Sequence, residues 1–201
     1  MAAQAAGFVL VGGESRRMGQ EKALLDLGGQ PLVVRTAERL RLVVVELSLV
    51  GSPQRFGDLG LPVLADRVTG RGPLAGIVTA LEATRHDWNL IMACDLPYLE
   101  TRFVEFLLEQ SATRPEADAV VPRPADGWQP LCAAYHRRCL PAFERVLASE
   151  KPKISHAYDA LRVHPITDEA LTRFAFSAQM FKNMNTPEEY EEAKRVLGLR
   201  A

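Results

Sequence analysis

Residues 7–22 read GFVLVGGESRRMGQEK, an apolar run that stops at two glycines and continues into a charged segment. The run 7–11 is short and rich in β-branched and aromatic residues, which predicts one buried strand rather than a helix. Gly12 and Gly13 have no Cβ, so the backbone there can turn sharply and a ligand can approach its amides closely. Arg17 and Lys22 add positive charge, and the segment is therefore suited to cradling a triphosphate.

Spacing excludes two well-known phosphate-binding loops. A Walker-type loop carries Lys and then Ser or Thr directly after its last glycine, whereas QEKA follows Gly19 here, and the dinucleotide pattern G-x-G-x-x-G is absent from the segment. Residues 10–22 instead resemble the signature L-x-G-G-x-S-x-R-M-G-x-[DE]-K of nucleotidyltransferases, most closely that of the molybdenum cofactor guanylyltransferases. The alternative, a glycine turn followed by a solvated charged stretch, is disfavoured because several residue types recur together at fixed spacing after a strand.

Farther along, apolar runs of strand length alternate with runs of helical periodicity. This alternation predicts right-handed βαβ units and a doubly wound α/β domain with a mostly parallel sheet, and the resemblance implies a Rossmann-like nucleotidyltransferase. We expect strands at 43–50, 62–65 and 89–94, helices at 32–42 and 74–84, and in the second half an antiparallel hairpin of 117–122 with 130–136 that extends the sheet. We expect further helices at 140–149 and 154–161, and a last one that Thr186, Pro187 and Glu189 start and Gly198 stops.

Length and composition narrow the class of protein. The 201 residues fit one domain, in which we assign 1–100 to nucleotide binding and 101–201 to acceptor binding. A formal net charge of −1 excludes a global basic field, so we expect no nucleic acid partner. The odd count of cysteines has no C-x-x-C pair and indicates reduced thiols. Neither a signal peptide nor an apolar stretch of membrane-spanning length is evident, so we expect a cytoplasmic protein with no membrane partner.

Two aspartates follow predicted parallel strands. Asp66 comes after 62–65 and Asp95 after 89–94, and the carboxyl ends of parallel strands form the edge where open α/β sheets bind ligands. Residues 92–97, MACDLP, resemble the family's C-D-x-P element, whose aspartate holds magnesium. One carboxylate together with substrate phosphates suffices for Mg²⁺, although a turn-capping role before Pro97 is the plainer alternative for Asp95.

The resemblance implies a nucleotide-binding set and a catalytic set. Asp66 corresponds to a nucleotide-binding aspartate, Ser48 stands where guanylyltransferases often place an asparagine, and Val11 replaces the usual alanine. The nucleotide-binding candidates are Leu10, Val11, Gly12, Gly13, Lys22, Ser48, Asp66 and Asp95. The catalytic candidates are Lys22, Asp95 and Arg17, with Asp95 as the metal ligand. The GPLAG element, 72–76, opens a helix near the nucleotide, and a purely structural role suits it as well as ligand contact.

Later segments resemble the acceptor side of the family's cleft. QPLC, 129–132, is similar to the family's H/Q-P-L-x segment, and 181–187 to its N-x-N-T-P segment. The acceptor-binding candidates are Gln129, Lys151, Lys153, Asn183 and Asn185. On physical grounds alone, turn and cap roles suit the two asparagines better, and a solvated basic turn suits either lysine.

The resemblance covers essentially the whole chain and implies the activity of a molybdenum cofactor guanylyltransferase. GTP and molybdenum-bound molybdopterin would give the guanine dinucleotide cofactor and pyrophosphate, with Mg²⁺ as cofactor. We also expect transient contact with cofactor-receiving apoenzymes or chaperones. The alternatives are a nucleotidyltransferase that uses CTP or acts on another small phosphate, and a non-catalytic carrier of the finished cofactor.

Overall fold

The computed structural model describes residues 4–12, 21–68 and 70–199. The strands are β1 Ala5–Leu10, β2 Glu46–Val50, β3 Val63–Leu64, β4 Trp88–Ala93, β5 Ala119–Arg123, β6 Cys132–His136 and β7 Val163–Thr167. The α-helices are α1 Leu32–Arg41, α2 Pro53–Phe56, α3 Pro73–Ala83, α4 Thr101–Ala112, α5 Leu140–Leu147, α6 Asp168–Arg173 and α7 Pro187–Val196. The 3₁₀ helices are η1 Lys22–Leu24, η2 Gly57–Leu59, η3 Arg137–Cys139, η4 Ile154–Ala160 and η5 Ala178–Phe181.

These strands form one sheet in the order β3-β2-β1-β4-β6-β5-β7. Strand β1 pairs in parallel with both β2 and β4, and the pairs β2–β3 and β5–β7 are also parallel. Only β6 runs the other way, antiparallel to both β4 and β5. The predicted doubly wound sheet with an antiparallel extension is therefore confirmed.

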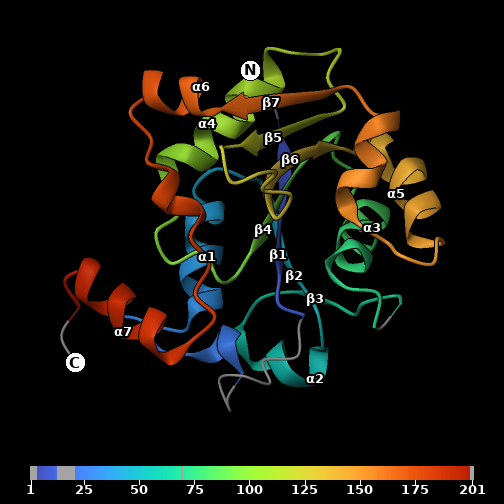
Figure 1. Cartoon of the computed structure of the whole chain (residues 1–201). Coiled ribbons are helices and arrows are strands. Elements are labelled where there is room, and N and C mark those ends of the chain that lie inside the picture. Colours follow the sequence, from blue (N-terminus) through green and yellow to red (C-terminus); the bar gives the residue numbers. More distant parts are fainter. Residues whose placement is uncertain (1–3, 13–20, 69, 200–201) are drawn as a thin grey trace.

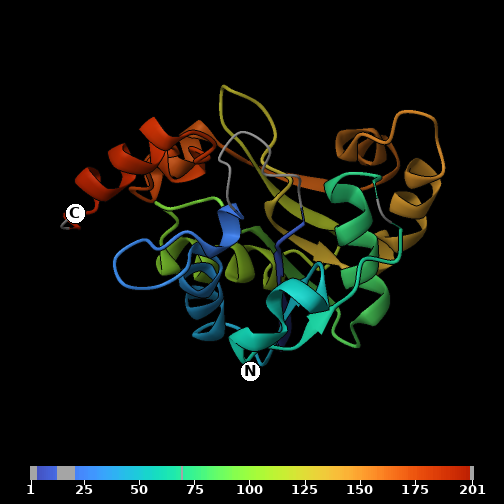
Figure 2. The same cartoon turned by 90° about the horizontal axis from the view of Figure 1, so that it is seen from below.

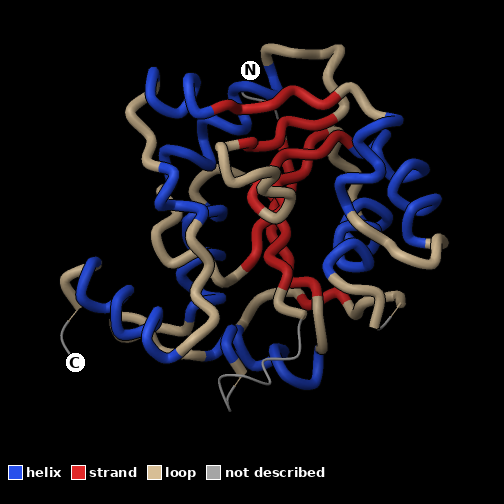
Figure 3. Tube along the Cα trace, viewed as in Figure 1, coloured by secondary structure: helices blue, strands red, loops and turns tan. Residues whose placement is uncertain are grey.

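Helices cover both faces of the sheet. Figure 1 shows α1 and α4 on one side and α3 and α5 on the other, and Figure 3 shows the strands as a layer between them. All six residues of β1 are buried, as expected for a strand that packs against helices on both faces. Val9 belongs to the apolar layer under α1 and α4, whereas Phe8 belongs to the layer under α3 and α5.

The predicted strand 43–50 is three residues too long. The backbone N–H groups of Val43 and Val44 both donate to the carbonyl of Leu40, so these residues close the end of α1. Val45 is 62% exposed, and β2 begins at the next residue. The run of valines, 43–45, therefore belongs to the turn before β2 and not to the strand.

The start of α7 is the best-defined helix cap that the sequence predicted. The Thr186 hydroxyl accepts from the backbone N–H of Glu189 at 3.2 Å, and the Glu189 carboxylate accepts from the N–H of Thr186 at 3.0 Å. Pro187 fills the first helical position, and Gly198 follows the helix with a φ of 66°. The predicted capping box is thus confirmed.

Loss of this cap should destabilise α7. Thr186→Ala removes the hydroxyl acceptor, and we expect a loss of about 1 kcal/mol in the free energy of unfolding. Thr186→Ser keeps the acceptor and is the matched control. Urea denaturation followed by circular dichroism measures both, and equal stability of Thr186→Ala and the parent chain would contradict this role.

Candidate functional site

The order in which strands are added reverses between β1 and β4: β2 and β3 extend the sheet on one side of this point, and β6, β5 and β7 extend it on the other. Open α/β sheets bind ligands at the carboxyl edge beside such a switch point. Gly12 follows β1 there, and Asp95 follows β4. Segments from the beginning, the middle and the end of the chain lie along this edge (Figure 2).

Lys22 and Asp95 form an ion pair at this edge. The Lys22 ammonium lies 2.6 Å from the Asp95 Oδ2 atom, and the two side chains are only 16% and 15% exposed. Lys22 also donates to the amide oxygen of Asn185 at 2.7 Å. The structure therefore brings together residues separated by 73 and 163 positions in the chain.

Asn185 was assigned to the acceptor side, yet its side chain binds the lysine expected to meet the nucleotide. The Glu189 carboxylate accepts from the backbone N–H of Asn185 at 2.6 Å, so the first turn of α7 orients this residue. Just before it, the N–H of Met184 donates to the carbonyl of Asp95 at 3.0 Å. The segment before α7 is thus fastened to both members of the ion pair.

Helix α7 is also held against the segment that follows Lys22. The Tyr190 hydroxyl donates to the backbone carbonyl of Asp26. Gly28 has a φ of +77°, and a Cβ placed on it would lie 2.7 Å from the Leu199 side chain. A glycine is therefore needed where the C-terminal segment approaches this turn.

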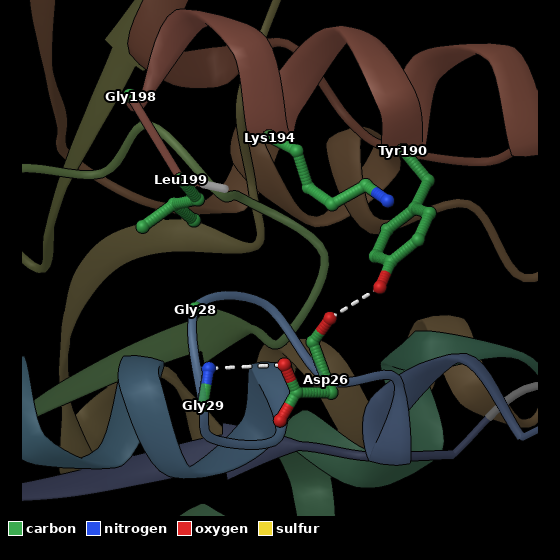
Figure 4. A pocket seen from close by; sticks show the side chains of 7 residues that line it. All are labelled: Asp26, Gly28, Gly29, Tyr190, Lys194, Gly198 and Leu199. Atoms are coloured by element: carbon green, nitrogen blue, oxygen red, sulfur yellow. Dashed lines mark hydrogen bonds between the residues drawn. The ribbon is translucent and has the colours of Figure 1, made fainter. Parts of the chain in front are cut away.

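A pocket of about 430 Å³ lies at this seam (Figure 4). Its lining residues are Asp26, Gly28, Gly29, Tyr190, Lys194, Gly198 and Leu199. None of them is a predicted site residue, and Lys194 there is already engaged with the Tyr190 ring and with Glu191. We interpret the pocket as the seam by which α7 docks, and the Lys22–Asp95 pair as the centre of the site.

Gly12 and Asp66 meet on the other side of β1. A Cβ placed on Gly12 would lie 3.2 Å from the Asp66 Oδ2 atom, and one placed on Gly76 would lie 3.2 Å from the Leu10 side chain and 3.6 Å from Asp66 Oδ1. The first turn of α3 can therefore pack closely onto the end of β1. This contact supports the structural reading of the GPLAG element.

Asp66 carries a buried oxygen that no described residue binds. Its Oδ1 atom is buried and has no hydrogen-bond partner within the described residues, and burial raises the pKa of this carboxyl. Because a buried polar atom without a partner is costly, the arrangement is the kind that a ligand donor would complete.

The stability of the free protein should reflect this cost. Because the pKa of Asp66 is raised on folding, ionising it disfavours the folded state above the unfolded pKa of about 3.9, and this effect is absent at lower pH, where both states are protonated. Asp66→Asn should therefore raise Tm at pH 7 and leave it nearly unchanged at about pH 3. Calorimetry tests this, with the exposed Asp58→Asn as control, and a lower Tm at pH 7 would contradict it.

The remaining nucleotide-side candidates differ in how they can act. Leu10 and Val11 are buried core side chains, so only their backbone can meet a ligand. Ser48 is buried inside β2 opposite Phe8, two residues before the strand ends. Gly13 and Arg17 lie outside the described residues. The contact of each with nucleotide stays a prediction.

The acceptor-side candidates lie in separate places. Gln129 precedes β6, and its backbone N–H donates to the carbonyl of Pro122 at the end of β5. Lys151 and Lys153 are exposed after α5, and Asn183 is exposed before α7. The structure places Gln129 and Asn185 at the edge near Asp95, whereas the two lysines lie on the α5 side.

The site offers one carboxylate to a metal rather than a ready-made cluster. Within the described ranges, no group of three or more His, Cys, Asp or Glu side chains is arranged to hold an ion. The Oδ1 atom of Asp95 is buried and has no partner among the described residues, while Oδ2 pairs with Lys22. Such a donor suits a hard ion that takes most of its ligands from water and phosphate.

The described cysteines are inert core residues. All three are buried free thiols, and burial together with the charge of Asp95 raises the pKa of Cys94 to about 12. A thiol with such a pKa is not a nucleophile at neutral pH. Within the same residues, no helix is both long and apolar enough to cross a membrane.

Comparison with known proteins agrees with this geometry. The family model described as "MobA-like NTP transferase domain" matches residues 7–168. The "Probable molybdenum cofactor guanylyltransferase" of Pelotomaculum thermopropionicum is 38% identical over 95% of this chain and 92% of its own length. The "Molybdenum cofactor guanylyltransferase" of Desulfosudis oleivorans is 33% identical over 95% of each chain.

A solved structure is similar over the whole fold. It is the molybdopterin-guanine dinucleotide biosynthesis protein A from Archaeoglobus fulgidus, with a TM-score of 0.82 and 26% identity, covering 96% of this chain and 98% of that one. Both the sequence and the fold therefore match over nearly the full length.

Proposed function

The chain belongs to the MobA-like NTP transferase family, and on that premise we propose that it is a molybdenum cofactor guanylyltransferase. It transfers GMP from GTP to molybdenum-bound molybdopterin and releases pyrophosphate. The observation that carries the proposal is the Lys22–Asp95 pair at the sheet edge, because one member suits a phosphate and the other a divalent cation.

The reaction needs no covalent enzyme intermediate. An oxygen of the acceptor's terminal phosphate attacks the α-phosphorus of GTP, a new P–O bond forms, and the bond to the β-phosphate oxygen breaks. Catalysis then consists of positioning and of stabilising charge on the phosphates. Cys94 and Cys139 are not suited to act as nucleophiles, since burial raises their pKa and keeps the thiols protonated.

Each residue at the edge has a place in this scheme. The backbone at Gly12, with Lys22 and the predicted Arg17, would meet the triphosphate. Asp95 would hold magnesium through its unpartnered Oδ1, and the bound ion would neutralise charge on the phosphates. We assign residues 1–100 to the nucleotide and 101–201 to the acceptor, with Asn185 as the contact between the halves.

The ion pair also has to change partners. In the free protein Lys22 and Asp95 neutralise each other at 2.6 Å. A triphosphate would attract the ammonium and repel the carboxylate, and a divalent cation would attract the carboxylate, so the two side chains would separate when GTP and magnesium bind. Asn185 can hold Lys22 during this exchange because it carries no charge.

Asp95→Asn should therefore have opposite effects on catalysis and on metal-free binding. We expect at least a hundredfold loss of turnover with magnesium, because the charged metal ligand is lost. Without metal, we expect tighter GTP binding, because the repelling carboxylate is gone. Calorimetry and a transfer assay measure both, with Asp87→Asn at the opposite edge as control. Unchanged turnover would remove Asp95 from the metal site.

Lys22→Ala should weaken GTP binding by about ten- to a hundredfold, the loss of one hydrogen bond to a charged group. Lys22→Arg should rescue poorly, since a broad planar guanidinium does not replace a compact ammonium between phosphates. Calorimetry with GTP and magnesium measures the affinity. If Lys22→Ala bound GTP as the parent chain does, the triphosphate would lie elsewhere.

The choice of nucleotide tests the function itself. Guanine presents N–H donors and a carbonyl acceptor that backbone groups near Gly12 can meet, and we predict a preference for GTP over CTP of at least tenfold in kcat/KM, about 1.4 kcal/mol. Competition of the two nucleotides for molybdopterin measures this. A cytosine dinucleotide as main product would establish the cytidylyl alternative. A carrier would release no pyrophosphate with any nucleotide.

A further inference from the structure

The loop between β5 and β6 carries an arginine that the proposed chemistry has not used. Arg123 is the last residue of β5 and is exposed. Its guanidinium carbon lies 4.9 Å from the centroid of the Trp128 ring. The backbone of Arg123 pairs with Thr167 of β7, but its guanidinium makes no hydrogen bond or ion pair with any residue in the described part of the chain.

The topology places this arginine on the edge of the site. Strand β5 is antiparallel to β6, which is antiparallel to β4, so β5 and β4 end on the same edge. Where β6 lies between them, β4 and β5 are two strand spacings apart, about 10 Å, and Arg123 and Asp95 come at or just after the ends of these two strands. The nucleotide candidates Gly12 and Asp66 lie on the other side of β4. Arg123 therefore belongs to the acceptor half.

A series of buried contacts holds this arginine in place. The Trp128 ring packs edge-on against Tyr158, with centroids 5.0 Å apart. The hydroxyl of Tyr158 is hydrogen-bonded to that of Tyr135 at 2.9 Å, and Tyr135 also donates to the carbonyl of Pro130 at 2.9 Å. Tyr135 is fully buried, so the loop and its tryptophan are anchored in the core.

The Trp128 ring supports an exposed arginine side chain that pairs with no acid among the described residues. An exposed side chain normally loses rotamer freedom when it binds, and stacking on an aromatic ring reduces that loss. A guanidinium donates up to five hydrogen bonds in its own plane. A group fixed in this way is prepared for a ligand with acceptor atoms in one plane.

We propose that Arg123, held over Trp128, binds the pterin ring of the acceptor. This inference rests on the proposed function and names a contact within it. The reacting phosphate of the acceptor must lie by Lys22 and Asp95, so the part that reaches Arg123, two strands farther along the sheet, is the other end of the molecule. A pterin has a ring carbonyl and ring nitrogens that accept hydrogen bonds in the ring plane, which matches the guanidinium.

Steady-state kinetics provides the first test. Arg123→Gln should raise KM for molybdopterin at least tenfold and change KM for GTP less than twofold. Arg85→Gln, at the opposite edge of the sheet, is the matched control and should behave as the parent chain. An unchanged molybdopterin KM in Arg123→Gln would overturn the proposal.

Direct binding provides the second test and does not depend on turnover. The chain has two tryptophans, so Trp88→Phe leaves Trp128 as the only one. In this variant a phosphate-free pterin, 6-hydroxymethylpterin, should quench the tryptophan fluorescence. Adding Arg123→Gln should raise the pterin concentration needed for half-maximal quenching at least tenfold. Equal quenching in both would contradict the proposal.

Binding of inorganic phosphate distinguishes the two ends of the acceptor. If Arg123→Gln weakened the binding of inorganic phosphate but left quenching by 6-hydroxymethylpterin unchanged, the arginine would bind the phosphate end and the proposal would be wrong. If the parent chain transferred no GMP while pterin quenching still required Arg123, the proposed function would fail and this site would stand.

Discussion

Parallel pairing of β1 with both β2 and β4 is the constraint on which the site depends. Because β3 in turn pairs in parallel with β2, the carboxyl ends of β1, β3 and β4 lie on one edge, and Gly12, Asp66 and Asp95 follow these ends. The pairing is stable because β1 and β4 are buried throughout and pack against helices on both faces. The residues of the candidate site therefore lie at the edge of a well-packed apolar layer.

The C-terminal segment completes this edge from outside the parallel core. Asn185 reaches Lys22, Met184 binds the backbone of Asp95, and α7 docks on the turn at Gly28. The capping box that starts α7 therefore does more than stabilise a helix, because the same Glu189 carboxylate fixes Asn185. In this way residues 184–199 influence a lysine near the beginning of the chain.

The sequence alone predicts those features that depend on short local patterns and on the alternation of strands and helices. The strand before Gly12, the aspartates after the third and fourth strands, and the capping box all follow from short stretches of residues. Helix α4 was not predicted, although Phe103, Phe106 and Leu107 recur at helical spacing, so its signal was present. Strand β7 was also missed, because Pro165 in a five-residue run argues against a strand unless it lies at the edge of a sheet, which is where it lies.

Long-range packing set the limit of prediction. No local pattern indicates that β6 inserts between β4 and β5, or that Asn185 crosses to the lysine of the nucleotide side. The support of Arg123 by Trp128, Tyr158 and Tyr135 likewise depends on contacts between separate elements. Such contacts depend on the close fit of side chains in three dimensions, which a single sequence does not display.

The proposed chemistry requires that Lys22 and Asp95 exchange partners when the substrate binds. A crystal structure with GTP and magnesium but no acceptor tests it most directly, since the nucleotide then has no group to which GMP can pass. We predict that the Lys22 ammonium lies on a phosphate oxygen and that Asp95 ligates the metal, with the 2.6 Å contact between them broken. A bound nucleotide beside an intact Lys22–Asp95 pair would contradict the account.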